Sequence, residues 1–161
     1  MARLAAVPER RSAFRERRRF AALSEPLESI GQLVYRRPAH LEKITTWPQP
    51  ERLVVDGDRL VLTPAYEPPR VVDLASQPEL RVLIEAIRGP LSGDLGALQR
   101  AFAVRIAGGL SAWALDLAPL DPRAMRFLRH VRIAGAGAEI REVALVQANG
   151  DEQTILIGPA P

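Results

Sequence analysis

The chain has 161 residues, of which 47% are apolar and 25% charged, with a net charge of +3 and no cysteine. This length and composition predict one globular domain and exclude a disordered chain, and the lack of cysteine excludes disulfides, thiol nucleophiles and cysteine-ligated zinc. The apolar runs are also far shorter than the roughly 18 residues of a membrane-spanning helix.

Positive charge is concentrated at the start of the chain. Seven arginines and two acids give the first 20 residues a net charge of +5, so the rest of the chain carries −2. Residues 3–23 are predicted to form a helix with a solvated basic face, because four apolar residues have arginines between them: Leu4, Val7, Phe14 and Leu23. Aromatic residues, which nucleic-acid sites interleave with basic ones, make up only 5% of the chain. We therefore predict no nucleic-acid partner.

Two strand patterns follow this segment. Residues 29–37 alternate between two faces and are predicted to form a strand. Residues 51–63 predict a hairpin that turns at Gly57-Asp58, because this turn places Val55 opposite Leu60 on one face. A further short strand is expected at 71–74.

Two helices are predicted in the middle of the chain. The first, at about 78–88, begins at the capping-box spacing of Ser76 and Glu79 and ends at Gly89-Pro90. The second spans about 92–102. Both carry apolar residues at helical spacing: Leu80, Leu83, Ile84 and Ile87 in the first, and Leu95, Leu98 and Phe102 in the second.

From residue 103 the apolar period returns to two. We predict a strand around Trp113, a turn of helix that begins at Asp121-Pro122, and three strands at 128–134, 138–148 and 152–158. The last two are expected to turn at Gly150-Asp151, which pairs Val146 with Ile155. The order of these elements predicts an α+β fold, with one curved antiparallel sheet and helices against its concave side.

Residues suited to catalysis or metal binding are few. His40 and His130 show no metal-ligand spacing, and none of the six serines lies in a Gly-x-Ser-x-Gly elbow. Glycine motifs that bind phosphate or dinucleotides are also absent from the sequence. We expect no enzyme activity, no catalytic residue, no metal and no cofactor, and we interpret both histidines as ordinary surface or strand-edge residues.

Four segments occur in a characteristic order. They are Phe14-Arg15-Glu16, the strand 29–38 that ends in Arg37-Pro38, the segment 53–60 that enters Asp56-Gly57, and the strand 113–119 that ends at Pro119. Their order and spacing over about residues 7–158 resemble the LolA-like periplasmic lipoprotein-carrier family, especially its LolA-related branch. In that family the first segment belongs to a helix and the other three to strands.

The resemblance implies a single LolA-like domain over 1–161. Its fold would be a strongly curved, incompletely closed antiparallel β-barrel, with the helices at 78–88 and 92–102 as a lid over the concave side. Arg37 matches an arginine that in the family hydrogen-bonds to the lid backbone and holds the closed, empty state. The cavity would hold its ligand against Leu33, Tyr35, Arg37, Leu41, Ile44, Trp47, Val55, Leu60 and Trp113, under the lid residues Leu80, Leu83, Ile84, Ile87, Leu95 and Leu98.

The function implied by the resemblance is that of a periplasmic carrier or chaperone. It would bind acyl chains of a lipoprotein, a lipid or a polyene-type lipid and transfer them towards the outer membrane, with an inner-membrane exporter and an outer-membrane acceptor as possible partners. Because the family is exported and no signal sequence is evident at the start of this chain, we expect a mature form whose leader has been removed.

Two other functions stay open at this point. The first is a non-carrier interaction module with a packed barrel core, accessory to a membrane lipid exporter, whose basic first helix docks on a membrane protein or an anionic lipid surface. The second is a hydrolase or transferase that acts on acyl substrates. This second function requires a serine, a histidine and an acid that converge in the cavity.

Overall fold

Eleven strands form one antiparallel sheet in the computed structural model, which describes residues 8–158. The strand order is β6-β5-β4-β3-β2-β1-β11-β10-β9-β8-β7, so β6 and β7 are the two edges and the first and last strands pair in the middle. The strands are β1 (Glu9–Arg19), β2 (Leu27–Arg36), β3 (His40–Trp47), β4 (Glu51–Asp56), β5 (Arg59–Thr63), β6 (Arg70–Asp73), β7 (Phe102–Gly108), β8 (Trp113–Pro119), β9 (Leu128–Ala136), β10 (Glu139–Gln147) and β11 (Glu152–Ile157).

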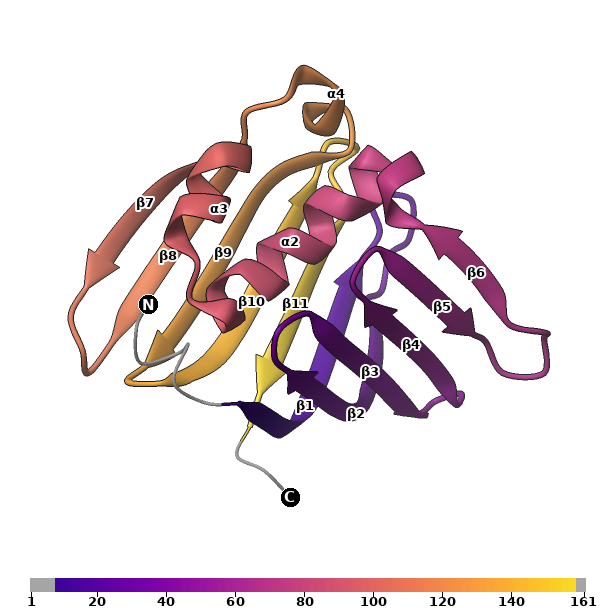
Figure 1. Ribbon diagram of the computed structural model, residues 1–161. Coiled ribbons are helices and arrows are strands. Elements are labelled where there is room, and N and C mark those ends of the chain that lie inside the picture. The colour runs from indigo at the N-terminus through magenta and orange to yellow at the C-terminus, as the bar shows by residue number, and fades with distance from the viewer. Residues whose placement is uncertain (1–7, 159–161) are drawn as a thin grey trace.

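The helical segments lie on the concave side of this sheet or at its end (Figure 1). They are η1 (Leu74–Ser76), α2 (Pro78–Ser92), α3 (Leu95–Ala101) and α4 (Pro122–Met125). The longest of them, α2, crosses the strands, and α3 packs beside it. The predicted fold class is thereby confirmed: the sheet bends strongly, does not close into a barrel, and carries helices over its concave side.

The prediction of a helix at residues 3–23 is wrong for the part that the structure describes. Residues 9–19 form β1, the strand at the centre of the sheet, paired with β2 on one side and β11 on the other. Phe14 and Glu16 are buried on one face, while Arg15 and Arg17 are exposed on the other, which is the period of a strand. The remaining part of the predicted helix before residue 8 lies outside the described residues.

Both middle helices are present, with different ends from those predicted. Helix α2 continues through Gly89 and Pro90 to Ser92, where Gly93 adopts the left-handed conformation. A side chain at Gly89 would collide with Leu98, so this glycine lets α3 approach α2 closely. Packing of the two helices thus overrides the weak helix propensity of Gly-Pro. The predicted capping box is also wrong, because α2 begins after Gln77 without a side-chain cap.

The two predicted hairpins differ in outcome. In β4–β5, Val55 pairs with Leu60, as predicted. In β10–β11 the predicted register is wrong: Val146 pairs with Glu152, and Ile155 pairs with Val143. The chain turns over more residues there, because the amide of Gly150 donates to the carbonyl of Gln147 and Gly150 has φ of 92°. A type I-like turn followed by a left-handed glycine makes a longer loop than a two-residue turn.

Strands β2 and β3 approach each other closely at Gly31. A Cβ atom there would collide with the carbonyl oxygen of Ile44 and lie 2.8 Å from the ring of Phe14. The pairing of β2 with β3 also shifts register between Ile30 and Gly31. A bulge and a glycine at one point permit a sharp local bend.

Among residues 8–158, no helix has both the length and the apolar character needed to cross a membrane.

Candidate functional site

A cavity of about 940 Å³ lies between the concave face of the sheet and α2. Its size falls within the roughly 300–1,000 Å³ of sites that enclose small ligands. The wall is mainly aliphatic and comes from both halves of the sheet and from the helix: Leu33, Leu41, Leu53, Leu60, Leu80, Leu83, Ile84, Ile87, Leu91, Ile133, Ile140, Val143, Leu145, Ile155 and Ile157. Such a wall offers dispersion contacts and exclusion of water to an apolar ligand.

Eight of the predicted site residues line this cavity. Leu33 and Tyr35 on β2, Leu41 on β3 and Leu60 on β5 form the sheet side, and the helix side is formed by Leu80, Leu83, Ile84 and Ile87. All four residues on the sheet occupy the alternate positions that face α2, and the four on the helix form its inner stripe. The period-two pattern of the strands and the helical spacing in α2 therefore place these eight residues around one cavity.

The other apolar residues of the prediction do not line the cavity. Val55 and Leu98 are fully buried in the core instead. Ile44 lies on the opposite face of β3 from Leu41, and Trp47 is 54% exposed at the end of that strand. The remaining two also lie elsewhere: Trp113 covers Gly135 with its indole nitrogen donating to Gly137, and Leu95 is half-buried on α3.

Arg37 lies at the end of β2, where its side chain is exposed and its backbone amide donates to the carbonyl of Pro8 at 2.9 Å. Its role as a lid clamp stays a prediction. A different arginine, Arg88 of α2, makes a lid-to-sheet contact that the sequence analysis missed. Its guanidinium donates to the carbonyl of Ala39 at 3.1 Å and also to the carbonyl of Gly57. One buried side chain of the helix thereby holds two loops of the sheet.

Tyr35 gives the cavity a polar group at the end of β2. Its hydroxyl donates to the carbonyl of Pro38 at 3.1 Å. Burial raises the pKa of this phenol above its ordinary value, although the charges of Arg37, Arg88 and Arg10 act in the opposite direction. The hydroxyl therefore stays neutral and available for hydrogen bonding at physiological pH.

A second group missed by the sequence analysis is a charged cluster on the concave face. It consists of Glu16 and Arg18 on β1 and Lys43 on β3; both cations line the cavity. Glu16 is only 2% exposed and accepts hydrogen bonds from Arg18 and Lys43. Two cations thus contact one buried carboxylate, in a lining that also includes other charged residues, among them Arg10 and Glu139.

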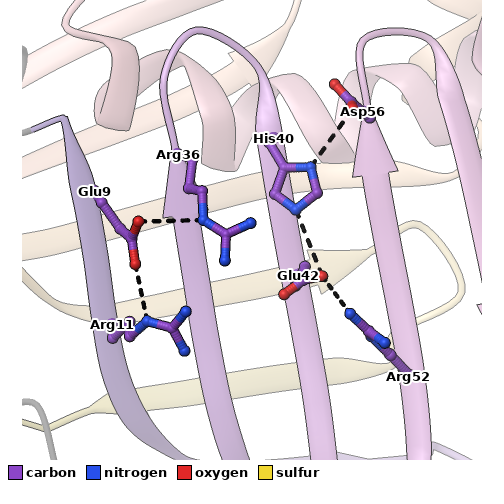
Figure 2. Close-up of polar contacts among 7 residues, drawn as sticks. All are labelled: Glu9, Arg11, Arg36, His40, Glu42, Arg52 and Asp56. Carbon is purple, nitrogen blue, oxygen red and sulfur yellow. Dashed lines mark hydrogen bonds and ion pairs between the residues drawn. The ribbon is translucent and has the colours of Figure 1, made fainter.

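The opposite face of the same strands carries a separate polar network (Figure 2). Glu42 is buried there and accepts a 2.6 Å hydrogen bond from Arg52, while His40 lies 3.5 Å from Glu42 and 3.6 Å from Asp56. Burial would raise the pKa of Glu42, but Arg52 and His40 together hold it below its usual value. These contacts compensate for a buried carboxylate and lie away from the cavity, on the face opposite Lys43.

The two histidines do not line the cavity among the described residues. His40 belongs to the network just described, and His130 lies 3.2 Å from Asp116 on the outer face of β8 and β9. The converging serine, histidine and acid that an acyl hydrolase requires are thus not assembled by either histidine at this cavity.

The family model described as "Outer membrane lipoprotein carrier protein LolA-like" matches residues 1–161. A LolA superfamily protein from Nitrosomonas europaea has a similar structure, with 9% identity, a TM-score of 0.46, and coverage of 92% of this chain and 83% of that one. A putative outer membrane lipoprotein-sorting protein domain from Vibrio parahaemolyticus gives 11% identity, a TM-score of 0.42 and the same coverage.

A third solved structure is the MucA/MucB complex of Pseudomonas aeruginosa, with 12% identity and a TM-score of 0.45. The match covers 99% of this chain but only 56% of that chain. A comparison with curated protein sequences found no similar protein.

Proposed function

Since this chain belongs to the LolA-like family of outer membrane lipoprotein carriers, we propose that it is a periplasmic carrier that holds acyl chains in the cavity under α2. The observation that carries the proposal is the aliphatic wall of a cavity of about 940 Å³. Its cargo is the acyl part of a lipoprotein, a lipid or a polyene-type lipid, which it passes from an inner-membrane exporter towards the outer membrane.

The energetics of such a cavity suit a carrier. Each methylene group that moves from water into an apolar site contributes about 0.8 kcal/mol. A long acyl chain is therefore held firmly by burial alone, without a covalent bond or a cofactor. Release requires that the wall be able to move, and the lid is one helix attached to an open sheet rather than a closed barrel. A cavity of about 940 Å³ also supports a carrier over an interaction module with a packed core.

The proposal is tested by native mass spectrometry of the protein purified from a bacterial periplasm. We expect a mass excess that disappears on organic extraction, and the extracted molecule identifies the cargo class. Leu33→Trp, which fills the cavity, should lose this mass excess, whereas Leu156→Trp, on the exposed outer face, should keep it. A bare polypeptide mass, unchanged after incubation with cell-envelope lipids, would contradict the proposal.

A further inference from the structure

The charged cluster of Glu16, Arg18 and Lys43 is unusual in its position. Lys43 is the only lysine of the chain; its side chain is 15% exposed and its neighbours across the strands are Leu33 and Leu53. Glu16 pairs in register with Ile155, whose neighbour on β10 is Val143. Ionised groups are costly in such surroundings unless they are paired, so a charged cluster here calls for an explanation.

Pairing within the cluster is incomplete. The ammonium of Lys43 contacts Glu16 and lies 5.3 Å from the centre of the Phe14 ring. The Nε of Arg18 lies 2.5 Å from Glu16. Among residues 8–158, the terminal nitrogens of Arg18 donate no hydrogen bond, and Lys43 has no hydrogen-bond partner other than Glu16. An ammonium has three donors and a guanidinium five, so several donors remain for a ligand.

The cluster has one positive charge in excess. Arg18 and Lys43 carry two positive charges and Glu16 one negative charge. Asp151 and Glu152 also line the cavity, and Glu152 is in register with Arg19, the neighbour of Arg18 on β1. Neither forms an ion pair with Arg18 within the described part of the chain, and Asp151 accepts hydrogen bonds from Ala21 and Asn149 instead. The cluster of these three residues therefore lacks one negative charge for balance.

We propose that Arg18 and Lys43 bind the anionic head of a single acyl ligand whose chain lies along the aliphatic wall of the same cavity. The head is an oxyanion with one negative charge, either the carboxylate of a fatty acid or the phosphodiester of a lipid. Buried Glu16 holds the two cations in place by accepting from both, as a carboxylate between two donors does. This inference rests on the proposed carrier function and adds to it the charge of the cargo.

Binding measurements with three probes of similar chain length test the inference: palmitate, palmitoyl lysophosphatidylglycerol and neutral hexadecanol. We expect the protein to bind at least one of the two anions about tenfold more tightly than hexadecanol, which corresponds to about 1.4 kcal/mol. The tighter of the two anions identifies the source of the oxyanion. Binding of all three with equal affinity would overturn the charged-head inference and leave the carrier function intact, whereas binding of none would overturn both.

Variants assign the preference to the cluster. Arg18→Met and Lys43→Met should each lower the ratio of anion to alcohol affinity towards one, while Glu16→Gln should raise it, because it removes the competing carboxylate. Arg17→Met is the matched control, since Arg17 is exposed on the other face of the same strand, and it should leave the ratio unchanged. If the role of the cluster is purely structural, these variants should alter folding but should not shift the ratio of anion to alcohol affinity in the directions given above. If Lys43→Met does not fold, the ratio for the more exposed Arg18→Met decides the outcome, and an unchanged ratio overturns the inference.

Discussion

Replacement of Arg88 by methionine tests whether one side chain holds the lid helix on the sheet. The substitution keeps most of the aliphatic stem and removes the guanidinium, whose side chain is 7% exposed. Two hydrogen bonds to the carbonyls of Ala39 and Gly57 are lost. Hydrogen bonds that involve a charged group are worth about 1.5–3 kcal/mol each. Because Gly57 is exposed, water can hydrogen-bond to its carbonyl in place of Arg88. We therefore expect the free energy of unfolding to fall by about 2 kcal/mol.

The expected loss is large enough to measure. For a chain of this size, about 1 kcal/mol changes the melting temperature by roughly 2–4 °C, so Arg88→Met should melt about 4–8 °C lower. Hydrogen exchange should show faster opening of α2, and an apolar fluorescent probe should enter and leave the cavity faster. Arg81→Met is the matched control, because Arg81 lies on the same helix, is 50% exposed, and is 3.9 Å from Asp58. Exposed pairs of this kind contribute about 0–1 kcal/mol. Equal melting temperatures and equal probe exchange in the two variants would refute a lid role for Arg88.

Two further predictions concern Tyr35 and Gly31. In a Tyr66→Phe variant, absorbance titration should show that burial makes Tyr35 ionise above its ordinary pKa in the folded protein. Because the pKa of Tyr35 is higher in the folded than in the unfolded protein, the contribution of this tyrosine to stability is complete below the unfolded pKa. That contribution is lost as pH rises through the folded pKa. Ionisation of folded and denatured protein at the same pH would contradict this. Gly31→Ala should destabilise the fold by several kcal/mol in urea titration, because its Cβ meets the backbone of β3, whereas Gly109→Ala, with open space around it, should be close to neutral.

Much of the fold was predictable because apolar periodicity marks most of its elements. The period-two pattern around Leu33 and Tyr35 and the helical stripe from Leu80 to Ile87 each predicted an element that the structure contains. Strand β1 was not predictable in the same way. Its inward positions hold Ser12, Glu16 and Arg18 besides Phe14, so the alternation of apolar and polar residues that identifies a strand is missing.

The residues of the candidate site were also predictable only in part. Aliphatic lining residues follow from periodicity, whereas Trp47 and Trp113, which were expected at the ligand from the resemblance, lie outside the cavity. Lys43 and Arg88 carry a faint signal, since each interrupts an apolar row: Lys43 two residues after Leu41, and Arg88 four residues after Ile84. The backbone directs a charge in such a row inward, where it needs a partner, yet only contacts between distant segments show which partner it finds.

The pairing of β1 with β11 has a consequence for how the cavity comes into existence. Strands β1 to β6 form one half of the sheet and β7 to β11 the other, and the seam between the halves joins the two ends of the described chain. During synthesis the first half emerges with β1 as an exposed edge, and the seam forms only when β11 has emerged. Contacts this far apart in sequence are slow to form. The wall of the cavity is therefore completed last, so a growing chain has no place for cargo until β11 is available.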